Sequence, residues 1–152
     1  MKALVQRVTE ASVEVEGRRV SKIGAGLLVL LGIRAEDGPS DVAWLARKLP
    51  ALRIFSDANG QMNRSVLDIG GSLLVISQFT LYADTCGGNR PSFIAAARPE
   101  QAGPLYEEVV RQLRVMVGES RVETGVFGAS MKVRLLNDGP VTVELCSDER
   151  HA

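Results

Sequence analysis

The dipeptide Gly139-Pro140 lies between two strand-like segments near the end of the chain, and it restricts the fold more than any other feature. Residues 131–135 and 141–145 alternate apolar and polar side chains, as strands with one buried face do. Asp138-Gly139 is a common hairpin signal, but the proline that follows has no N–H to give to a ladder. The pattern predicts two paired strands joined by an unusual turn. Because about 5–6% of X-Pro bonds in folded proteins are cis, the pattern alone favours a trans peptide.

The rest of the chain carries the periodicities of both strands and helices. Apolar residues at helical spacing predict one helix that begins at Ser40 or Asp41 and ends at Pro50, and another from Pro99 to Gly118. Apolar or alternating runs predict further strands at residues 4–8, 13–15, 20–23, 27–33, 52–55 and 72–81. The run at 27–33 is apolar throughout, which indicates a strand covered on both faces.

Mixed connections between about eight strands and two main helices predict an α+β fold. We expect a mixed, mostly antiparallel curved sheet or partial barrel, with the two helices packed on it. A length of 152 residues fits one domain with a substantial core, so residues 1–152 are predicted to form a single domain.

Charge and composition exclude several classes of protein. Eighteen basic and eighteen acidic residues balance, which argues against a protein that coats nucleic acid electrostatically; a bound nucleic acid would be held over a short part only. The longest apolar run, residues 23–33, is too short to span a bilayer, and no secretory signal is visible, so a cytoplasmic location is expected. Cys86 and Cys146 are predicted to be reduced thiols without a zinc site.

Few side chains offer catalytic chemistry. The one histidine, His151, is the penultimate residue, which argues against a Ser-His-Asp or Cys-His hydrolase and against a histidine metal site. Residues 77–81 place hydroxyls and an amide at the end of an apolar strand. Thr80 is a candidate nucleophile with no evident base nearby, and the main-chain N–H groups from Gln78 to Thr80 are a candidate oxyanion hole. The same segment also fits an ordinary edge strand. The glycine-rich loop between 85 and 92 is predicted to be either a mobile loop near a site or a plain connector.

Taken together, several short motifs resemble the D-aminoacyl-tRNA deacylase family. Each motif is weak alone, but the family's order and spacing are kept from residue 1 to about 146. The motifs are Gln6-Arg7-Val8, Ala11-Ser12-Val13, Ser77-Gln78-Phe79-Thr80-Leu81, Arg90-Pro91-Ser92-Phe93, Phe127-Gly128-Ala129-x-Met131 and Asn137-x-Gly139-Pro140-Val141-Thr142.

The resemblance implies an enzyme that hydrolyses the ester between a D-amino acid and the terminal adenosine of tRNA. It implies a homodimer with the active site at the interface, the 3′ acceptor end of aminoacyl-tRNA as partner, and no cofactor, metal or membrane. In the family, the peptide matching Gly139-Pro140 is cis and enters the other subunit's pocket, where its carbonyls exclude L side chains. Glycine has no side chain to exclude, so glycyl-tRNA mischarged on tRNA(Ala) is a further expected substrate.

The resemblance also gives roles to individual residues. Next to Ser77, the main-chain N–H groups of Gln78, Phe79 and Thr80 bind the ester carbonyl, and a 2′-hydroxyl of the tRNA supplies the chemistry. The Thr80 side chain is the second choice as nucleophile. Arg7 holds the Gly-Pro segment, and the remaining substrate-binding positions are Phe127, Met131 and Asn137.

One departure from the family pattern concerns the loop before Arg90-Pro91. The family commonly has a lysine there, whereas residues 86–89 contain none, which removes a candidate phosphate contact. The alternative function is a non-catalytic module of the same fold that binds the tRNA end. A conventional serine or threonine esterase is a third option, disfavoured by the lack of a positioned histidine.

Overall fold

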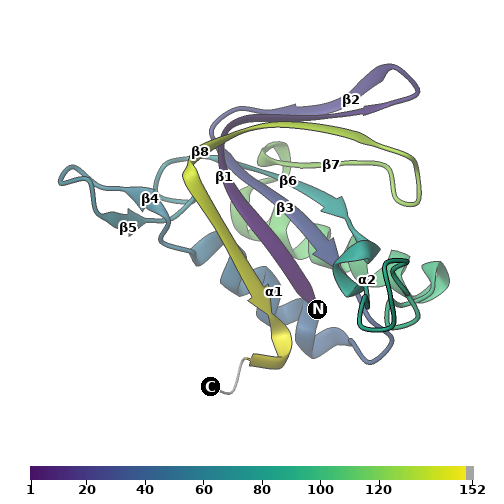
Figure 1. The fold of residues 1–152 in the computed structure, drawn as a ribbon. Coiled ribbons are helices and arrows are strands. Elements are labelled where there is room, and N and C mark those ends of the chain that lie inside the picture. The colour runs from purple at the N-terminus through teal and green to yellow at the C-terminus, as the bar shows by residue number, and fades with distance from the viewer. Residues whose placement is uncertain (150–152) are drawn as a thin grey trace.

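The computed structural model describes residues 1–149 as eight strands and two α-helices (Figure 1). This composition confirms the predicted α+β class. The strands are β1 (Lys2–Val15), β2 (Arg18–Ile23), β3 (Gly26–Gly32), β4 (Phe55–Ser56), β5 (Met62–Arg64), β6 (Ser72–Ser77), β7 (Val122–Thr124) and β8 (Lys132–Cys146). The helices are α1 (Pro39–Ala51) and α2 (Pro99–Val117), with 3-10 turns η1 (Phe79–Tyr82), η2 (Glu119–Arg121) and η3 (Ser147–Glu149).

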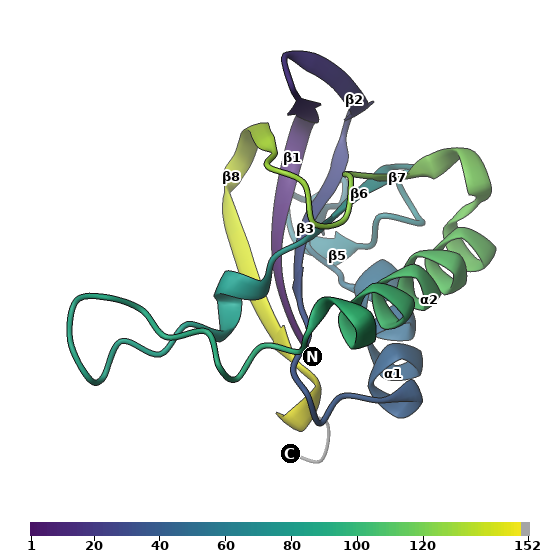
Figure 2. The same ribbon diagram turned by 90° about the vertical axis from the view of Figure 1, so that its right-hand side faces the viewer.

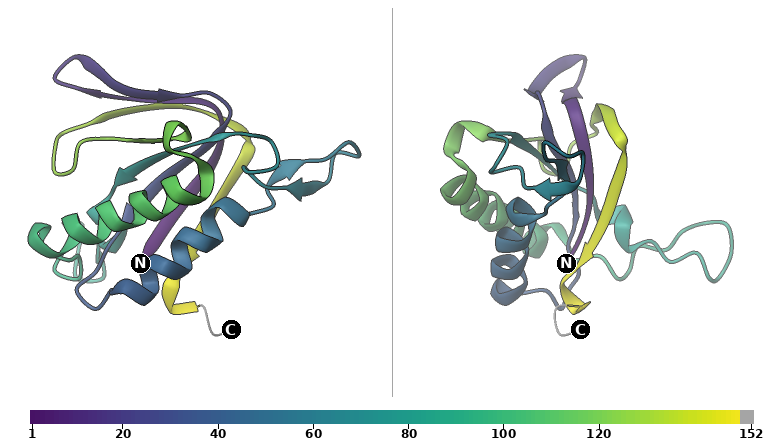
Figure 3. Two further views of the ribbon diagram at one scale, coloured as in Figure 1. Left: turned by 180° about the vertical axis from the view of Figure 1, so that it is seen from behind. Right: turned by 90° about the vertical axis from the view of Figure 1, so that its left-hand side faces the viewer.

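Six strands form one mixed sheet in the order β2-β1-β3-β6-β7, and β8 pairs with β1 as well. The pairs that include β1 are antiparallel, whereas β3–β6 and β6–β7 are parallel. The Ser21 hydroxyl donates to the Thr124 carbonyl at 2.8 Å and so links β2 with β7 at the two ends of the order. The sheet therefore curls into a nearly closed barrel, with α1 and α2 on one side of it (Figure 3).

Strand β3 is covered on both faces, as its apolar run predicts. Leu27, Val29 and Leu31 pack in the larger apolar cluster, between the sheet and the helices. Leu28 packs in a second cluster on the opposite face, which forms the interior of the barrel. Because alternate residues of β3 are buried in these two clusters, the sequence here has no polar positions.

The prediction of two paired strands around Gly139-Pro140 is wrong. Strand β8 is one strand of 15 residues, and both of its halves pair with β1 instead of with each other. Gln6 pairs with Thr142 and Val8 with Asn137, so residues 138–141 bulge out of the ladder. The proline lies where the ladder is already interrupted, and a bulge accommodates its missing N–H.

Strand β1 is also a single strand of 14 residues, where the sequence predicts separate strands at 4–8 and 13–15. The polar residues between those segments mark the region where β1 leaves β3 and begins to pair with β2, not a break in the strand. The strand predicted at 72–81 ends at Ser77, and η1 follows it. Strands β5 and β7, of three residues each, are too short to give a periodic signal and were not predicted.

Helix α1 begins slightly earlier than predicted. Its N-cap is Gly38, with Pro39 as the first helical residue, where a missing N–H costs nothing. Asp41 lies at the third helical position and accepts the Gly38 N–H at 2.9 Å. Pro50 lies inside the last turn, and the helix ends one residue later. Helix α2 spans the predicted residues and is followed by Gly118.

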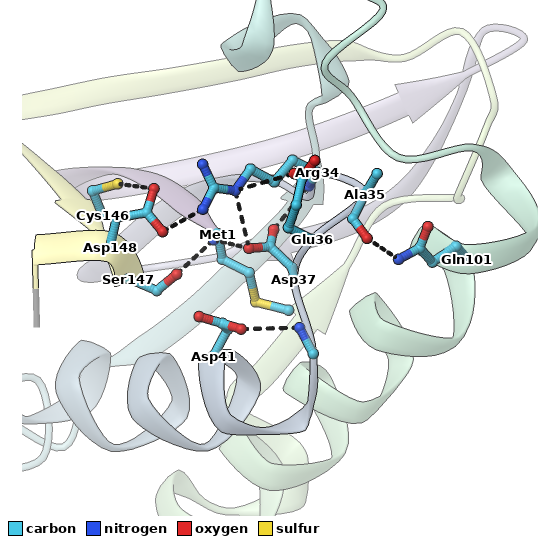
Figure 4. Close-up of polar contacts among 11 residues, drawn as sticks. Met1, Arg34, Ala35, Glu36, Asp37, Asp41, Gln101, Cys146, Ser147 and Asp148 are labelled. Carbon is cyan, nitrogen blue, oxygen red and sulfur yellow. Dashed lines mark hydrogen bonds and ion pairs between the residues drawn. The ribbon is translucent and has the colours of Figure 1, made fainter.

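A buried ionic cluster connects the N-terminus with the loop before α1 and with the turn after β8 (Figure 4). The Met1 ammonium donates to the Asp37 carboxylate at 2.5 Å and to the Ser147 hydroxyl at 2.6 Å. Asp37 also accepts the Arg34 main-chain N–H at 2.8 Å. The Met1 and Asp37 side chains are 0% and 1% exposed, so each charge depends on the other.

We expect Asp37→Asn to lower the free energy of unfolding by about 3 kcal/mol, because it leaves the buried ammonium without its counter-charge. Urea denaturation of the two proteins measures the difference. Glu36→Gln is the matched control, since Glu36 is 73% exposed and its ion pair with Arg34 has a distance of 3.6 Å. The control should change stability by less than about 0.5 kcal/mol. Equal losses in both variants would contradict the role given to the buried pair.

Candidate active site at the end of strand β6

A cavity of about 610 Å³ opens where strand β6 ends. Its walls come from the ends of β3 and β6, the segment 93–99, the first turn of α2, and residues 127–133. The lining is mostly apolar, with Ile76, Phe93 and Phe127 among the larger side chains. Arg98 carries the only charge among the lining side chains that the structure describes. The volume is within the usual range for small-ligand sites.

Two main-chain N–H groups next to this cavity make no hydrogen bond within residues 1–149. They belong to Phe79 and Thr80, the first two residues of η1. The Gln78 N–H, by contrast, donates to the Leu31 carbonyl at 2.7 Å. Of the three N–H groups predicted to form an oxyanion hole, those of Phe79 and Thr80 therefore remain as candidates, and main-chain oxyanion holes commonly provide two donors.

Thr80 has a polar partner but no base. Its hydroxyl accepts a hydrogen bond from the Gln78 side-chain amide. Among the described residues of the cavity wall, the one ionisable side chain is Arg98, and a guanidinium carries hydrogen-bond donors but no acceptor. A hydroxyl nucleophile needs a base in hydrogen-bond reach, so this wall gives Thr80 no activation.

Phe127 and Met131 both line the cavity, as their predicted role requires. The Phe127 ring packs on Tyr106 of α2, with 5.7 Å between the ring centroids. The Tyr106 hydroxyl donates to the Val75 carbonyl at 2.8 Å, and burial raises the pKa of Tyr106 to about 12, so it remains a donor at neutral pH. Tyr106 thus fixes Phe127 against β6. In the sequence, Tyr106 is part of an apolar helix face. A buried tyrosine hydroxyl needs a hydrogen-bond acceptor, and this is the one sequence signal of its role.

Met131 is close to the main chain at Gly125. A Cβ at position 125 would lie 2.5 Å from the Met131 sulfur, so a larger residue there would displace this side chain. Ile76 of β6 lies on the same side, 3.1 Å from that Cβ position. Gly125 thus leaves space for Met131 in the wall of the cavity that residues 127–133 provide.

The bulge in β8 contains a cis peptide between Gly139 and Pro140, as the family resemblance implies. Both residues are exposed. The Asn137 side chain closes the bulge: its amide donates to the Val141 carbonyl and its oxygen accepts the Val141 N–H, both at 3.0 Å. These two bonds replace the ladder hydrogen bonds that the bulge interrupts.

Arg7 of β1 fixes the other side of the bulge. Its guanidinium donates to the Asp138 carbonyl at 2.8 Å and to the Ile54 carbonyl at 2.6 Å. It also lies 3.4 Å from the Asp138 carboxylate. Arg7 therefore holds the segment before Gly139 in place, which is the position that the resemblance gives it.

Within one chain, the two groups of predicted site residues do not meet. Ser77, Gln78 and Phe79 line the cavity with Phe127 and Met131, whereas Arg7, Asn137, Gly139 and Pro140 are absent from its described lining. The glycine-rich loop projects from the body of the molecule (Figure 2), closed at its base by paired hydrogen bonds of 2.8 Å between Asp84 and Ser92. His151 lies outside the described residues.

Other sequence expectations concern thiols and membranes. Cys86 is exposed and Cys146 is half-buried, and neither forms a disulfide. In the part of the chain that the structure describes, no helix has the length and apolar character needed to cross a membrane.

Known proteins match this chain over nearly its whole length. The family described as D-Tyr-tRNA(Tyr) deacylase matches residues 4–146. D-aminoacyl-tRNA deacylases of Chlorobaculum parvum and Bacteroides thetaiotaomicron are 59% and 53% identical, each covering 99% of this chain, over 100% and 99% of their own lengths.

Solved structures agree with this match. One described as c-Myc DNA Unwinding Element Binding Protein has a TM-score of 0.91 and 45% identity, covering 95% of this chain and 97% of its own. A second, of a probable eukaryotic D-amino acid tRNA deacylase, has a TM-score of 0.76 over the same shares at 18% identity, and supports the fold alone.

The fold and the relatives together show that this protein is one of the ester hydrolases that proofread aminoacyl-tRNA. More narrowly, the chain belongs to the D-aminoacyl-tRNA deacylase family. Its reaction is the hydrolysis of the ester that joins a D-amino acid to tRNA.

Proposed function

We propose that two copies of this chain form the site together, and that the Gly139-Pro140 peptide of each copy rejects L-aminoacyl groups in the other's cavity. This proposal rests on the separation of the cavity from the Gly139-Pro140 bulge within one chain. The bulge is exposed and held by hydrogen bonds from Arg7 and Asn137, yet it does not line the cavity of its own chain. Exposed apolar side chains near both parts suit burial against a second copy, with Phe79 57% and Leu136 58% exposed.

The selective groups in this proposal belong to the main chain. Carbonyls of the peptide lie where the side chain of an L-amino acid would point, whereas a D side chain points away. Arg7 and Asn137 keep those carbonyls in position. Glycine carries no side chain to reject, so glycyl-tRNA mischarged on tRNA(Ala) is a second substrate of the same site.

Hydrolysis uses groups of the main chain and of the substrate itself. The ester carbonyl oxygen lies against the N–H groups of Phe79 and Thr80, which stabilise its negative charge as water adds to the carbonyl carbon. The 2′-hydroxyl of the terminal ribose positions that water. The ribose 3′-oxygen then leaves, takes up a proton, and frees the D-amino acid and the tRNA. Such tRNA is charged in the cytoplasm, where we place the enzyme.

The deciding experiment compares D-tyrosyl-tRNA with L-tyrosyl-tRNA on the purified protein. We expect release of D-tyrosine, with the L ester left intact, and cleavage of glycyl-tRNA(Ala). Equal release from both tyrosyl esters would contradict the chiral filter. Retention of tRNA on a filter without any ester loss would instead identify a non-catalytic module that binds the tRNA end.

A further inference from the structure

Within residues 1–149, Arg98 carries the one charge on the cavity wall, and neither the motifs nor the proposed mechanism uses it. It is the residue before the first turn of α2, and its side chain is exposed. No ion pair or side-chain hydrogen bond within residues 1–149 involves its guanidinium. A cation without a protein partner beside a ligand cavity is available to bind an anion.

The main chain around Arg98 is firmly held. The Ala97 N–H donates to the Ile33 carbonyl at 2.9 Å, and Ala96 forms a bridge with Arg34. On the other side, the Arg98 carbonyl accepts the Ala102 N–H at 2.8 Å, and the Gln101 side chain donates to the Ala35 carbonyl at 2.6 Å. Arg98 therefore lies at a fixed point of the cavity wall between β3 and α2, from which its exposed side chain extends.

The charges on the substrate determine which part of it Arg98 attracts. The terminal adenosine carries the α-ammonium of the amino acid at its 3′ side and a phosphodiester at its 5′ side. Arg98 repels the ammonium and attracts the phosphodiester. An arginine also matches two phosphate oxygens at once, which gives orientation as well as attraction.

We propose that Arg98 binds the phosphodiester that joins the terminal adenosine to the nucleotide before it. This contact turns the aminoacyl ester toward the N–H groups of Phe79 and Thr80. It rests on the proposed site for deacylation and provides a phosphate contact in a chain whose residues 86–89 contain no lysine. Arg98 is then a positioning residue for the known reaction.

Removing the guanidinium and removing the phosphate test the same contact from both sides. With D-tyrosyl-tRNA, Arg98→Ala should raise KM about tenfold with little change in kcat. The slope of log KM against log salt should fall by about 0.7, the value for one contact to a single strand. With the D-tyrosyl ester of adenosine, which has no phosphate, the variant and the wild type should be equal.

Two further variants separate the contact from a general loss of charge. Arg98→Lys keeps the cation but not the paired contact to two phosphate oxygens, so it should recover only part of the affinity, whereas Arg47→Ala, on the exposed face of α1, should leave KM unchanged. A tenfold loss that persists on the adenosine ester, or an unchanged KM with the tRNA, would overturn the proposal.

An equilibrium measurement decides the question without catalysis. Titration by NMR should show tighter binding of adenosine 5′-monophosphate than of adenosine to the wild type, and equal binding of the two to Arg98→Ala. A preference for the phosphate that survives in Arg98→Ala would place the phosphate elsewhere. If the wild type cleaves neither ester, the deacylation site is wrong, and the titration still tests Arg98.

Discussion

Gly139→Ala is expected to remove most D-aminoacyl-tRNA deacylation while the chain remains folded. Gly139 has a φ of +151°, and a Cβ there would lie 2.6 Å from the Val141 nitrogen and 3.3 Å from the Arg7 guanidinium. The first contact is with main chain, so the bulge itself must move. A displacement of about 1 Å in a positioning group costs about 100-fold in rate, and we expect a fall in kcat/KM of this size.

The matched control for this variant is Gly60→Ala. Gly60 also has a positive φ, of +78°, but a Cβ there meets nothing within 4 Å, and it lies in the turn between β4 and β5. Both variants incur the strain of a positive φ, of roughly 1–2 kcal/mol. The main-chain clash adds to this strain in Gly139→Ala, so its Tm should fall somewhat further than that of Gly60→Ala, whereas activity should fall in Gly139→Ala only. Equal activity in both would contradict a role for the bulge.

A mixing experiment shows in which chain the bulge acts. Ala129→Trp fills the cavity, because Ala129 lines it, and leaves the bulge intact. In a mixed dimer, the cavity of the Gly139→Ala chain receives the intact bulge of the Ala129→Trp chain. Refolding the two inactive variants together should then restore about a quarter of wild-type activity, since half the dimers have one working site of two. No recovery would contradict a shared site.

The sequence predicted the parts of the fold that depend on local periodicity. The apolar run of β3 and the helical spacing of α2 each indicate their structure without reference to a partner. The sequence did not predict the parts of the fold that depend on which strands pair with each other. The local signal of the β8 bulge, Asp-Gly, is the same as that of a hairpin turn, and only the register with β1 distinguishes the two.

In the candidate site, too, the sequence motifs predict some features, whereas others depend on contacts between distant residues. The motifs identify the segment from Ser77 to Thr80, but they do not show that the Gln78 N–H is already committed to the Leu31 carbonyl. Arg98 belongs to no motif, since its significance comes from lying on a wall whose other described side chains are uncharged. Tyr106 likewise acquires its role from a carbonyl on β6, 31 residues away in the sequence.

The second large expected effect concerns which hydroxyl takes part in hydrolysis, the 2′-hydroxyl of the tRNA or that of Thr80. A D-aminoacyl ester on the 3′-oxygen of a tRNA that ends in 2′-deoxyadenosine should be cleaved at least about 100-fold more slowly, because the group that positions water is missing. Thr80→Ala should keep its rate within about fivefold of the wild type. The reason is that the Thr80 hydroxyl has no base, while its N–H remains in the variant.

These two measurements discriminate because a threonine nucleophile predicts the reverse of both. If Thr80 attacked the ester, Thr80→Ala would be inactive with a normal fold, and the 2′-deoxy substrate would still acylate the enzyme. Thr80→Ser provides the control, since it keeps a hydroxyl that accepts from Gln78. Single-turnover rates on the normal and the 2′-deoxy substrate for wild type, Thr80→Ala and Thr80→Ser therefore assign the reaction either to the substrate's own hydroxyl or to the enzyme's.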